Sequence, residues 1–368
     1  MTEKDYHKKI LQVISPYFDQ EEINLTNLAK KANGVTPQEL YKILSKENIA
    51  IDNKILMLEK DISYLEPNPI DFDWRFTDDS VSDILNLIEI SKNNIGCFGV
   101  PSVFRKIVTH SDTILFDINP FLKDELPDCK NRIIVADLNF EKIIGYEFDI
   151  IIMDPPWYTN SFINWFKQAI NNLKSGGTIF TTKIPSLVRP SAVKDWESII
   201  NKINLYLSTE KKEIDILYKT PLFEIESYKS IGLMNIGDWR KAEFVSFKLI
   251  NKEILEFEIE PKNNWERYKF GNKTVSIKIT DNNQEIKIIP PYPDGSYILK
   301  SVSNRDEYKK KINFITSRNK ALIIQGTIKV NSFLKNLALT DNFNKSLVDN
   351  YTKQEIELLK EVYNLIKT

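Results

Sequence analysis

Hydrophobic positions change their spacing along the chain. In residues 3–18 and 24–46 they recur at helical spacing, which predicts three short helices. From about residue 78, buried-type apolar runs alternate with helical segments. These segments are a helix at 79–91, the run IGCFGV, a helix at 102–109, the runs TILFDI, RIIVADL and DIIIMD, a helix at 161–173, the turn KSGG and the run TIFTTKI. Continuous apolar strands separated by helices predict a parallel sheet covered on both faces.

The end of the sheet domain and the C-terminal region show different patterns. A helix at 191–207 and strands near 213–226 and 241–250 would close the sheet with an antiparallel hairpin. After Lys252, the segments WERYKFGNKTVSIKI and NQEIKIIP indicate a small strand-rich unit, and the last thirty residues indicate helix. Pro67 and Pro69 mark a linker where the first helical pattern stops. We therefore predict three domains, at residues 1–65, 66–252 and 253–368.

The N-terminal stretch NLAKKANGVTPQELYKIL resembles a helix-turn-helix. Gly34 lies at the predicted turn, Thr36 at the N-cap and Pro37 at the first helical position. A small wing would follow in IAIDNKILML. Residues 1–70 carry nine basic and eleven acidic side chains, which disfavours a strong grip on DNA. The alternatives are a structural or protein-contact domain and a nucleic-acid contact.

Composition narrows the class of protein. Of 368 residues, 42% are hydrophobic and 27% are charged, which excludes a disordered chain and a membrane protein. Fifty basic against 51 acidic side chains leave no global positive field, so binding of nucleic acid would require a local patch. Two cysteines and two histidines exclude a disulfide scaffold and a structural zinc cluster, and favour a reducing, cytoplasmic setting. The opening MTEKDYHKKI lacks an apolar signal core, so we expect no export.

The four residues Asp154, Pro155, Pro156 and Trp157 directly follow the apolar strand DIIIM. An open α/β sheet places its ligand crevice at this end of its strands. The structural alternative is a turn in which Asp154 caps backbone groups and Trp157 packs under a loop. A charged residue and two prolines add nothing to a core, so we favour a functional site.

The segment IIMDPPWY resembles the D/N-P-P-aromatic motif of class I S-adenosylmethionine-dependent methyltransferases that modify exocyclic amino groups, such as adenine N6. The resemblance implies an α/β fold with a Rossmann-like seven-stranded sheet. In this chain we expect a small helical, helix-turn-helix-like domain before the sheet domain and an α+β extension after it. It implies that the Asp154 carboxylate and the Pro155 carbonyl accept the two amine hydrogens. Pro156 would fix the turn, and Trp157 would stack on an unpaired base.

A cofactor site should precede this motif. Gly96 and Gly99 lie in IGCFGVPS, Asp117 ends the second strand 18 positions after Gly99, and Asp137 ends the third. By resemblance Asp117 would bind the ribose hydroxyls and Asp137 the adenine amine of S-adenosylmethionine. The predicted cofactor-binding residues are Gly96, Phe98, Gly99, Pro101, Ser102, Asp117, Asp137 and Leu138.

The first loop departs from the family pattern, because G-x-x-G-x-P-S replaces the usual glycine-rich loop. Its structural alternative is a close-packed strand-to-helix turn with Ser102 as a cap. The G-x-P-S segment resembles a group of N6-adenine methyltransferase-like proteins that includes enzymes acting on protein lysine. The acceptor therefore stays open between nucleobase and lysine.

The order of the elements also resembles the branched-chain polyamine synthases, which transfer an aminopropyl group from decarboxylated S-adenosylmethionine. Those enzymes have acidic residues in the first cofactor loop, and IGCFGVPS has none. We therefore rank aminopropyl transfer below methyl transfer. A catalytically silent binding module, with a protein partner at the N-terminal domain, is the third hypothesis.

Candidate substrate contacts lie in three places. Residues 300–330 hold eight basic and two acidic side chains, which indicates either a solvated face or contact with a phosphate backbone. Trp74 and Arg75 in DFDWRF are candidates to line the crevice, or are structural. The predicted substrate-binding residues are Tyr158, Arg189, Lys309, Lys310 and Arg318, with Arg189 alternatively pairing with a surface carboxylate.

Overall fold

The computed structural model describes residues 2–18, 24–49, 65–71, 73–90, 93–109, 112–234, 236–256, 265–280, 285–348 and 351–368. These residues divide into two compact units. The first contains the described parts of 1–58, 74–220 and 235–261, and the second those of 59–73, 221–234 and 262–368. The N-terminal helices thus belong to the same unit as the sheet domain. The predicted wing lies outside the described residues, except for its first residue.

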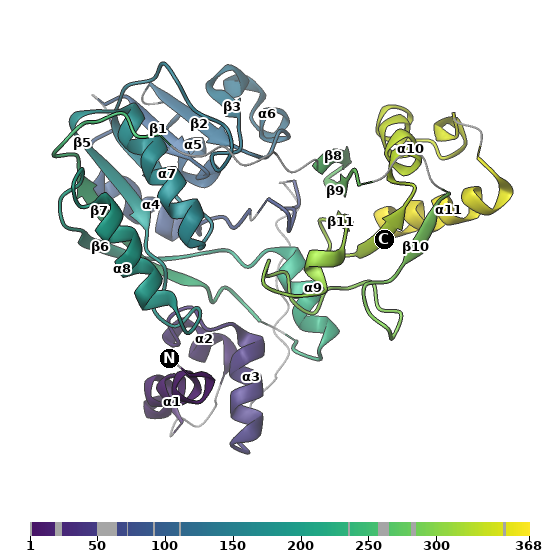
Figure 1. The fold of residues 1–368 in the computed structure, drawn as a ribbon, viewed down its shortest axis with the longest axis horizontal. Coiled ribbons are helices and arrows are strands. Elements are labelled where there is room, and N and C mark those ends of the chain that lie inside the picture. The colour runs from purple at the N-terminus through teal and green to yellow at the C-terminus, as the bar shows by residue number, and fades with distance from the viewer. Residues whose placement is uncertain are drawn as a thin grey trace. The chain divides into compact units, whose positions relative to one another are not determined.

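The three predicted N-terminal helices are confirmed. They are α1 (Glu3–Ile14), α2 (Leu25–Lys31) and α3 (Pro37–Lys46), with a short 3-10 turn after α1 (Figure 1). The Thr36 hydroxyl accepts a hydrogen bond from the Glu39 backbone N–H, so Thr36 caps α3 as predicted. Apolar side chains on the inner helix faces, including Ile10, Leu28 and Leu40, form the small core of this part.

The sheet of the first unit has seven strands in the order β3-β2-β1-β4-β5-β7-β6 (Figure 1). They are β1 (Ile95–Phe98), β2 (Thr113–Asp117), β3 (Ile133–Val135), β4 (Phe148–Met153), β5 (Leu173–Thr182), β6 (Lys211–Leu217) and β7 (Lys241–Lys248). The first five pair in parallel, and β7 pairs antiparallel with both β5 and β6. The strand order reverses between β1 and β4, which places a ligand crevice at their carboxyl ends. The predicted α/β sheet and its closing antiparallel hairpin are confirmed.

Helices cover the sheet between the strands. They are α4 (Asp78–Leu87), α5 (Pro101–Ile107), α6 (Leu122–Glu125), α7 (Thr159–Asn172) and α8 (Ala192–Ile203). Helix α5 packs with α4, and α7 packs with α8. The crossovers through α5 and α7 leave β1 and β4 in opposite directions along the sheet, so the right-handed rule puts the two helices on opposite faces. The buried β1 and β4 between them explain the near-continuous apolar runs.

Two local predictions are wrong. The strand predicted near 213–226 ends at Leu217, because Pro221 stops it and helix α9 (Leu222–Ser230) follows. The segment KSGG is not a turn outside the sheet, since β5 already begins at Leu173 and runs through it. Gly176 within this segment has a φ of 76°, which only glycine adopts readily.

The second unit contains a five-stranded antiparallel sheet, as its strand-rich sequence predicts. Its order is β10-β12-β11-β9-β8, formed by β8 (Trp265–Phe270), β9 (Lys273–Lys278), β10 (Lys287–Ile289), β11 (Phe314–Thr316) and β12 (Ala321–Gln325). Helices α10 (Thr327–Thr340) and α11 (Lys353–Lys367) pack on this sheet through Phe333 and Leu359. Helix α11 confirms the predicted C-terminal helix.

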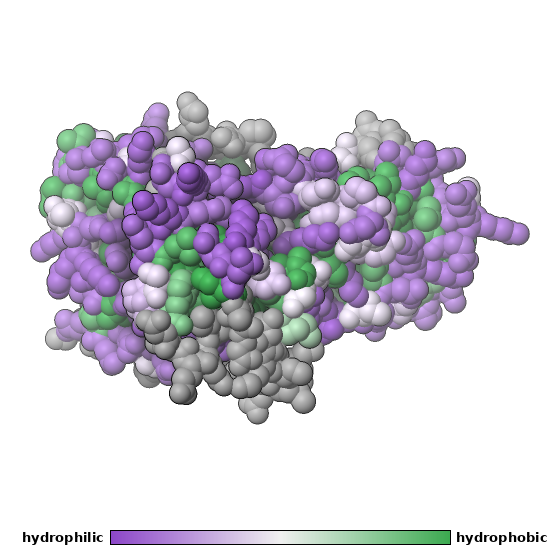
Figure 2. All heavy atoms as spheres, turned by 90° about the horizontal axis from the view of Figure 1, so that it is seen from below, coloured by the Kyte–Doolittle hydropathy of each residue, from purple (hydrophilic) through white to green (hydrophobic). Residues whose placement is uncertain are grey.

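Polar side chains dominate the coloured part of the face drawn in Figure 2. Figure 2 shows mostly hydrophilic residues on one face, with smaller hydrophobic areas among them. No helix within the described ranges is both long and apolar enough to cross a membrane.

Candidate active site

Asp154 lies where the sheet positions a ligand. It follows β4 directly, and its backbone N–H donates to the Phe98 carbonyl at the end of β1 at 3.1 Å. On the other side, β4 pairs with β5, whose last residue is Thr182. Asp154 is therefore held at the carboxyl edge of the sheet between two strands, as its sequence position predicts.

Two hydroxyl groups anchor the Asp154 carboxylate. Thr182 Oγ1 donates to Oδ1 at 2.7 Å, and the Tyr218 hydroxyl donates to the same oxygen at 2.8 Å. Burial raises the pKa of Asp154 to about 6, and the two hydroxyls and the positive charge of Arg240 act in the opposite direction. Asp154 is therefore mainly ionised at pH 7. No hydrogen bond from the described residues occupies Oδ2, so a hydrogen-bond acceptor remains at this oxygen.

The two prolines shape the turn after β4. The Tyr158 backbone N–H donates to the Pro156 carbonyl at 2.6 Å, which closes a tight turn before α7. The Pro155 carbonyl accepts no hydrogen bond from any described residue. This carbonyl and Asp154 Oδ2 are thus both without a hydrogen bond from the described residues, and their role as acceptors for an amine stays a prediction.

An aromatic box formed by Trp74, Trp157 and Tyr218 stands beside Asp154. Tyr218 makes edge-to-face contacts with both tryptophans, at centroid separations of 6.3 and 5.8 Å. The Arg240 guanidinium carbon lies 3.7 Å from the Trp157 ring centroid, 4.4 Å from that of Trp74 and 5.3 Å from that of Tyr218. Trp157 is only 6% exposed. The predicted stacking of a base on Trp157 would thus require Arg240 to move.

Glycines at the first cofactor loop are required by close packing. Gly99 has a φ of 63°, and a Cβ there would lie 2.6 Å from the Trp165 ring of α7. Gly96 lies inside β1, where a Cβ would lie 2.8 Å from the Phe148 ring. Close packing therefore accounts for both glycines, and the alternative of a close-packed strand-to-helix turn fits Gly99. That alternative is wrong in one detail, since Val100 rather than Ser102 occupies the N-cap of α5 and no side chain caps it.

The remaining predicted cofactor residues gather at the same edge. Phe98 ends β1, Asp117 ends β2, and Asp137 and Leu138 follow β3. Because these strands are parallel neighbours, their carboxyl ends face one crevice. Asp117 Oδ1 accepts from the Asn119 backbone N–H at 2.8 Å. Asp137 Oδ1 accepts in the same way from the Asn139 backbone N–H. Each of the two acidic side chains therefore also orders the loop that follows its strand.

Pro101 and Tyr158 begin the two helices that follow the loops. Pro101 is the first residue of α5, and Tyr158 is the partly exposed N-cap of α7. Proline suits a first helical position, where its missing N–H is not needed. Tyr158 therefore lies beside the predicted acceptor site, and its role in substrate binding stays a prediction.

Arg189 has a structural place in this site. It is 8% exposed, donates through Nη1 to the Trp157 carbonyl at 2.6 Å, and pairs through Nε with Asp195 at 2.7 Å. The alternative of pairing with a carboxylate is therefore confirmed. Two of its donors thus hold the Trp157 loop, so Arg189 has a positioning role, and its part in substrate binding stays a prediction.

The three basic candidates of the C-terminal region belong to the second unit. Lys309 is buried and donates to the Pro69 and Val302 carbonyls, so its predicted surface contact with substrate is wrong. Lys310 pairs with Glu307, and Arg318 pairs with Glu66 through a forked contact. Two of these three candidates, Lys310 and Arg318, therefore already pair with a carboxylate of the protein. Contact of the basic stretch with nucleic acid stays a prediction.

The helix-turn-helix-like segment contacts the loops of the site. Asn33 Nδ2 donates to the Ser186 hydroxyl at 2.6 Å, and a Cβ on Gly34 would lie 2.7 Å from Pro185. The loop that these contacts hold carries Arg189. The Thr26 hydroxyl of α2 accepts from the Gly237 backbone N–H, three residues before Arg240. The N-terminal helices therefore support both segments that surround Trp157.

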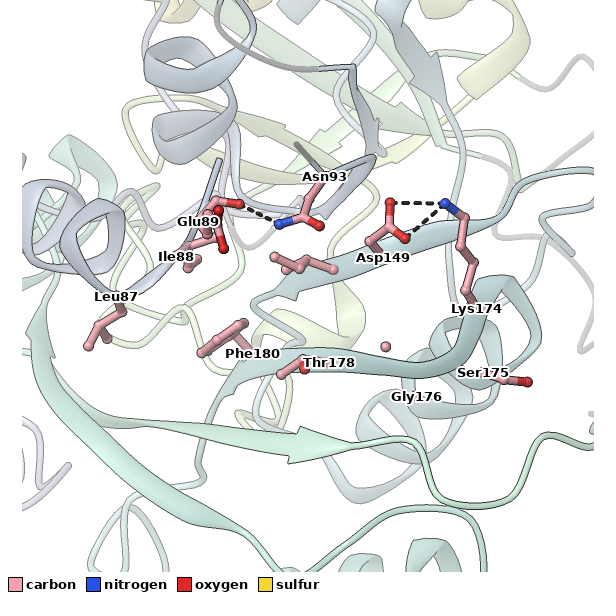
Figure 3. A pocket seen from close by; sticks show the side chains of 12 residues that line it. Leu87, Ile88, Glu89, Asn93, Asp149, Lys174, Ser175, Gly176, Thr178 and Phe180 are labelled. Carbon is pink, nitrogen blue, oxygen red and sulfur yellow. Dashed lines mark hydrogen bonds and ion pairs between the residues drawn. The ribbon is translucent and has the colours of Figure 1, made fainter. Parts of the chain in front are cut away.

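A hollow of about 420 Å³ lies at the opposite edge of the sheet. Figure 3 shows Asp149, near the start of β4, and Lys174, near the start of β5, side by side among the residues that line it, where they form an ion pair with a shortest separation of 2.8 Å. Asn93, which precedes β1, is another lining residue. Because the hollow is at the amino ends of the strands, it is separate from the crevice at Asp154.

Sequence reasoning missed Thr182, Tyr218 and Arg240. Thr182 carried a usable signal, since it ends a strand that neighbours β4 in the predicted sheet. Tyr218 and Arg240 reach the site only through the β6–β7 hairpin, where the Tyr218 backbone N–H donates to the Arg240 carbonyl. No local motif marks either residue.

The chain matches no protein-family model and no curated protein sequence. Its fold is similar to that of the branched-chain polyamine synthase from Thermus thermophilus, solved in complex with N4-aminopropylspermidine and 5'-methylthioadenosine. That match has 10% identity and a TM-score of 0.50, and covers 70% of this chain and 90% of the synthase. A mutein of the same synthase matches with 11% identity, the same coverage and the same TM-score.

The N-methyltransferase NodS from Bradyrhizobium japonicum, in complex with S-adenosyl-L-homocysteine, matches with 12% identity and a TM-score of 0.32. That match covers 47% of this chain and 87% of NodS. The strand order and the synthase match define the class of fold, which is the Rossmann-like α/β fold of class I methyltransferases and related transferases.

Proposed function

We propose that this protein is an S-adenosylmethionine-dependent methyltransferase that acts on an exocyclic amino group, with adenine N6 of DNA or RNA as the acceptor. One observation carries the proposal: the Asp154 carboxylate is fixed by Thr182 and Tyr218 beside the Pro155 carbonyl, at the crevice of the sheet. This pair of acceptors matches the two hydrogens of an amino group.

The residues at the crevice edge fit the proposed cofactor. Asp117 and Asp137 provide carboxylates, which accept hydrogen bonds from ribose hydroxyls and from an adenine amine. Asp117 ends β2, which is adjacent to β1, and Asp137 follows β3, the next strand outward, so both lie at the same edge of the sheet as Asp154. S-adenosylmethionine, when bound, supplies a methyl group to a nucleophilic nitrogen.

Asp154 and Pro155 would activate that nitrogen. The lone pair of an exocyclic amine is delocalised into the ring, and two acceptors on its hydrogens draw the nitrogen toward a tetrahedral geometry. The Asp154 carboxylate then stabilises the positive charge that develops on nitrogen. This role requires the ionised carboxylate, which the pKa of about 6 provides at neutral pH.

Aminopropyl transfer to a polyamine is the second candidate. Its support is the fold similarity to the Thermus thermophilus polyamine synthase, which extends over 70% of this chain. The site itself favours a neutral acceptor, because one carboxylate, Asp154, stands beside one cation, Arg240. A polyamine would bring further positive charges to a site that already contains one.

Calorimetric titration with S-adenosylmethionine and with its decarboxylated form tests the proposal, followed by labelled-methyl transfer to DNA, RNA and protein. We expect the methyl donor to bind more tightly. Asp154→Ala should leave that affinity nearly unchanged and lower methyl transfer roughly 100- to 1,000-fold, because it removes the hydrogen-bond acceptor together with its charge. Preference for the decarboxylated form would support aminopropyl transfer, and binding of neither form would support a silent binding module.

A further inference from the structure

Arg240 occupies a fixed position beside the proposed acceptor site. Its carbonyl accepts from the Tyr218 backbone N–H at 2.9 Å, just before β7 begins. The preceding segment is tied down by Asp238, which accepts from the Thr220 backbone N–H at 2.6 Å. The side chain then extends over the Trp157 ring at 3.7 Å. This position is therefore set by the β6–β7 hairpin and by the aromatic box together.

The Arg240 guanidinium is a cation with unused hydrogen-bond donors. Among the residues that the structure describes, no carboxylate forms an ion pair with it, and its Nε is buried without a hydrogen-bond partner. Arginine stays protonated and has five N–H donors, and contact with aromatic faces satisfies none of them. Leaving a buried donor of a charged group unpaired is costly. A ligand with an acceptor atom would remove that cost.

Asp154 and Arg240 flank the same tyrosine. The carboxylate accepts from the Tyr218 hydroxyl, and the guanidinium lies 5.3 Å from the centroid of its ring. The two charged groups form no direct ion pair within the described structure, although the charge of Arg240 acts on Asp154. The site thus presents an acceptor and a donor next to each other.

This pattern is complementary to an amino group that has an unprotonated ring nitrogen beside it. That nitrogen is bonded either to the carbon that carries the amino group or to the neighbouring ring carbon. Adenine has such nitrogens on both sides of its amine, N1 and N7, cytosine has N3 beside its N4 amine, and guanine has N3 beside its N2 amine. An aliphatic amine has no such acceptor, and its protonated form would be repelled by Arg240. The pattern therefore separates nucleobase amines from lysine and polyamines.

We infer that Arg240 is a specificity-determining residue, which donates a hydrogen bond to the ring nitrogen beside the amine that Asp154 binds. This inference rests on the proposed function and specifies its substrate class as nucleobase amines that have an unprotonated ring nitrogen beside them. Trp157 and Trp74 then serve as the platform that holds Arg240. In this arrangement the base meets the edge of the guanidinium.

Single-atom base analogues test this contact. The probes are single-stranded DNA and RNA oligonucleotides with one adenine, and the same strands with 1-deazaadenine or 7-deazaadenine, each of which replaces one ring nitrogen by CH. A parallel pair contains cytosine or 3-deazacytosine. Binding is measured by fluorescence anisotropy and methyl transfer by a labelled donor, using the full chain.

We expect one deaza replacement to weaken binding to the wild-type protein by roughly 10- to 100-fold, since a hydrogen bond to a charged group is lost. Arg240→Met should abolish this difference. Arg240→Lys should retain part of it, because a single-point donor remains. Lys241→Met is the matched control, since Lys241 is the next residue and contacts Asp215 instead of the aromatic box.

Two outcomes overturn the inference. One is an equal response of the wild-type protein to natural and deaza strands, or a difference that survives unchanged in Arg240→Met. The other is transfer to spermidine or a lysine peptide and to no nucleobase. In the first case, binding of S-adenosylmethionine together with methyl transfer to the natural strand shows that the proposed function still stands and that only the role of Arg240 has failed. In the second case the proposed nucleobase acceptor fails together with the inference. Absence of S-adenosylmethionine binding shows instead that the proposed function has failed.

Discussion

The Tyr218 hydroxyl donates a hydrogen bond of 2.8 Å to Oδ1 of Asp154, across a sequence separation of 64 residues. This bond stabilises the ionised carboxylate and opposes the effect of burial on its pKa. Tyr218→Phe removes the donor and keeps the ring that contacts Trp74 and Trp157. The pKa of Asp154 should therefore rise above its value of about 6.

The predicted consequence is a change in the pH profile. Methyl transfer requires ionised Asp154, so activity should fall as pH falls through about 6 in the wild-type protein. In Tyr218→Phe the midpoint should lie at higher pH, with recovery of activity in more alkaline buffer. Thr182→Val should shift the midpoint in the same direction, because Thr182 donates to the same carboxylate oxygen. The positive charge of Arg240 also lowers the pKa of Asp154. An unchanged midpoint in kcat/KM would contradict the role of the two hydroxyls.

Asp117 and Asp149 provide a matched pair of acids at opposite edges of one sheet. Asp117 ends β2 at the crevice, whereas Asp149 lies near the start of β4 and pairs with Lys174. Asp117→Asn should weaken S-adenosylmethionine binding by roughly 10- to 100-fold, through loss of charge-assisted hydrogen bonds. Asp149→Asn should leave the affinity unchanged. Calorimetry on both variants checks this, and equal affinities would remove Asp117 from the cofactor site.

The sheet could be predicted because its signals are local. The buried strands β1 and β4 are continuous apolar runs, and Asp154 stands out as a charged residue directly after one of them. The segment after β6 is harder to predict from the sequence, because its alternating apolar residues also fit a strand. Pro221 ends that strand, and the following residues form α9 instead.

The rest of the site depends on contacts between distant segments. Tyr218 reaches Asp154 because β6 pairs with β7 at the far side of the sheet, and no short sequence window contains that register. Arg240 is similarly placed by Gly237, which bonds to Thr26 of the N-terminal helices. A local motif therefore points to Asp154, whereas its neighbours Tyr218 and Arg240 emerge only from the tertiary structure.

Gly99 tests how closely the first loop is packed. Gly99→Ala would place a Cβ 2.6 Å from the Trp165 ring in a backbone with a φ of 63°. We expect a loss of about 2–4 kcal/mol in the free energy of unfolding, from overpacking and left-handed strain together. Gly145→Ala is the control, because it has a φ of 87° and open space around the Cβ, and should cost about 1–2 kcal/mol. Urea unfolding measures both, and equal losses would show that packing against Trp165 contributes nothing.

Variants of Arg189 can distinguish a role in positioning the Trp157 loop from direct binding of the substrate. The residue joins the Trp157 carbonyl to the Asp195 carboxylate, so its loss should displace the motif loop without removing a substrate contact. In Arg189→Lys a single ammonium group replaces the planar fork of arginine and cannot make both contacts. This variant should lower kcat roughly tenfold with little change in the KM for the acceptor. Asp195→Asn weakens the same clamp from its outer end, and should give a smaller effect of the same kind. A large rise in KM with unchanged kcat in Arg189→Lys, absent in Asp195→Asn, would instead mean that Arg189 binds the acceptor directly.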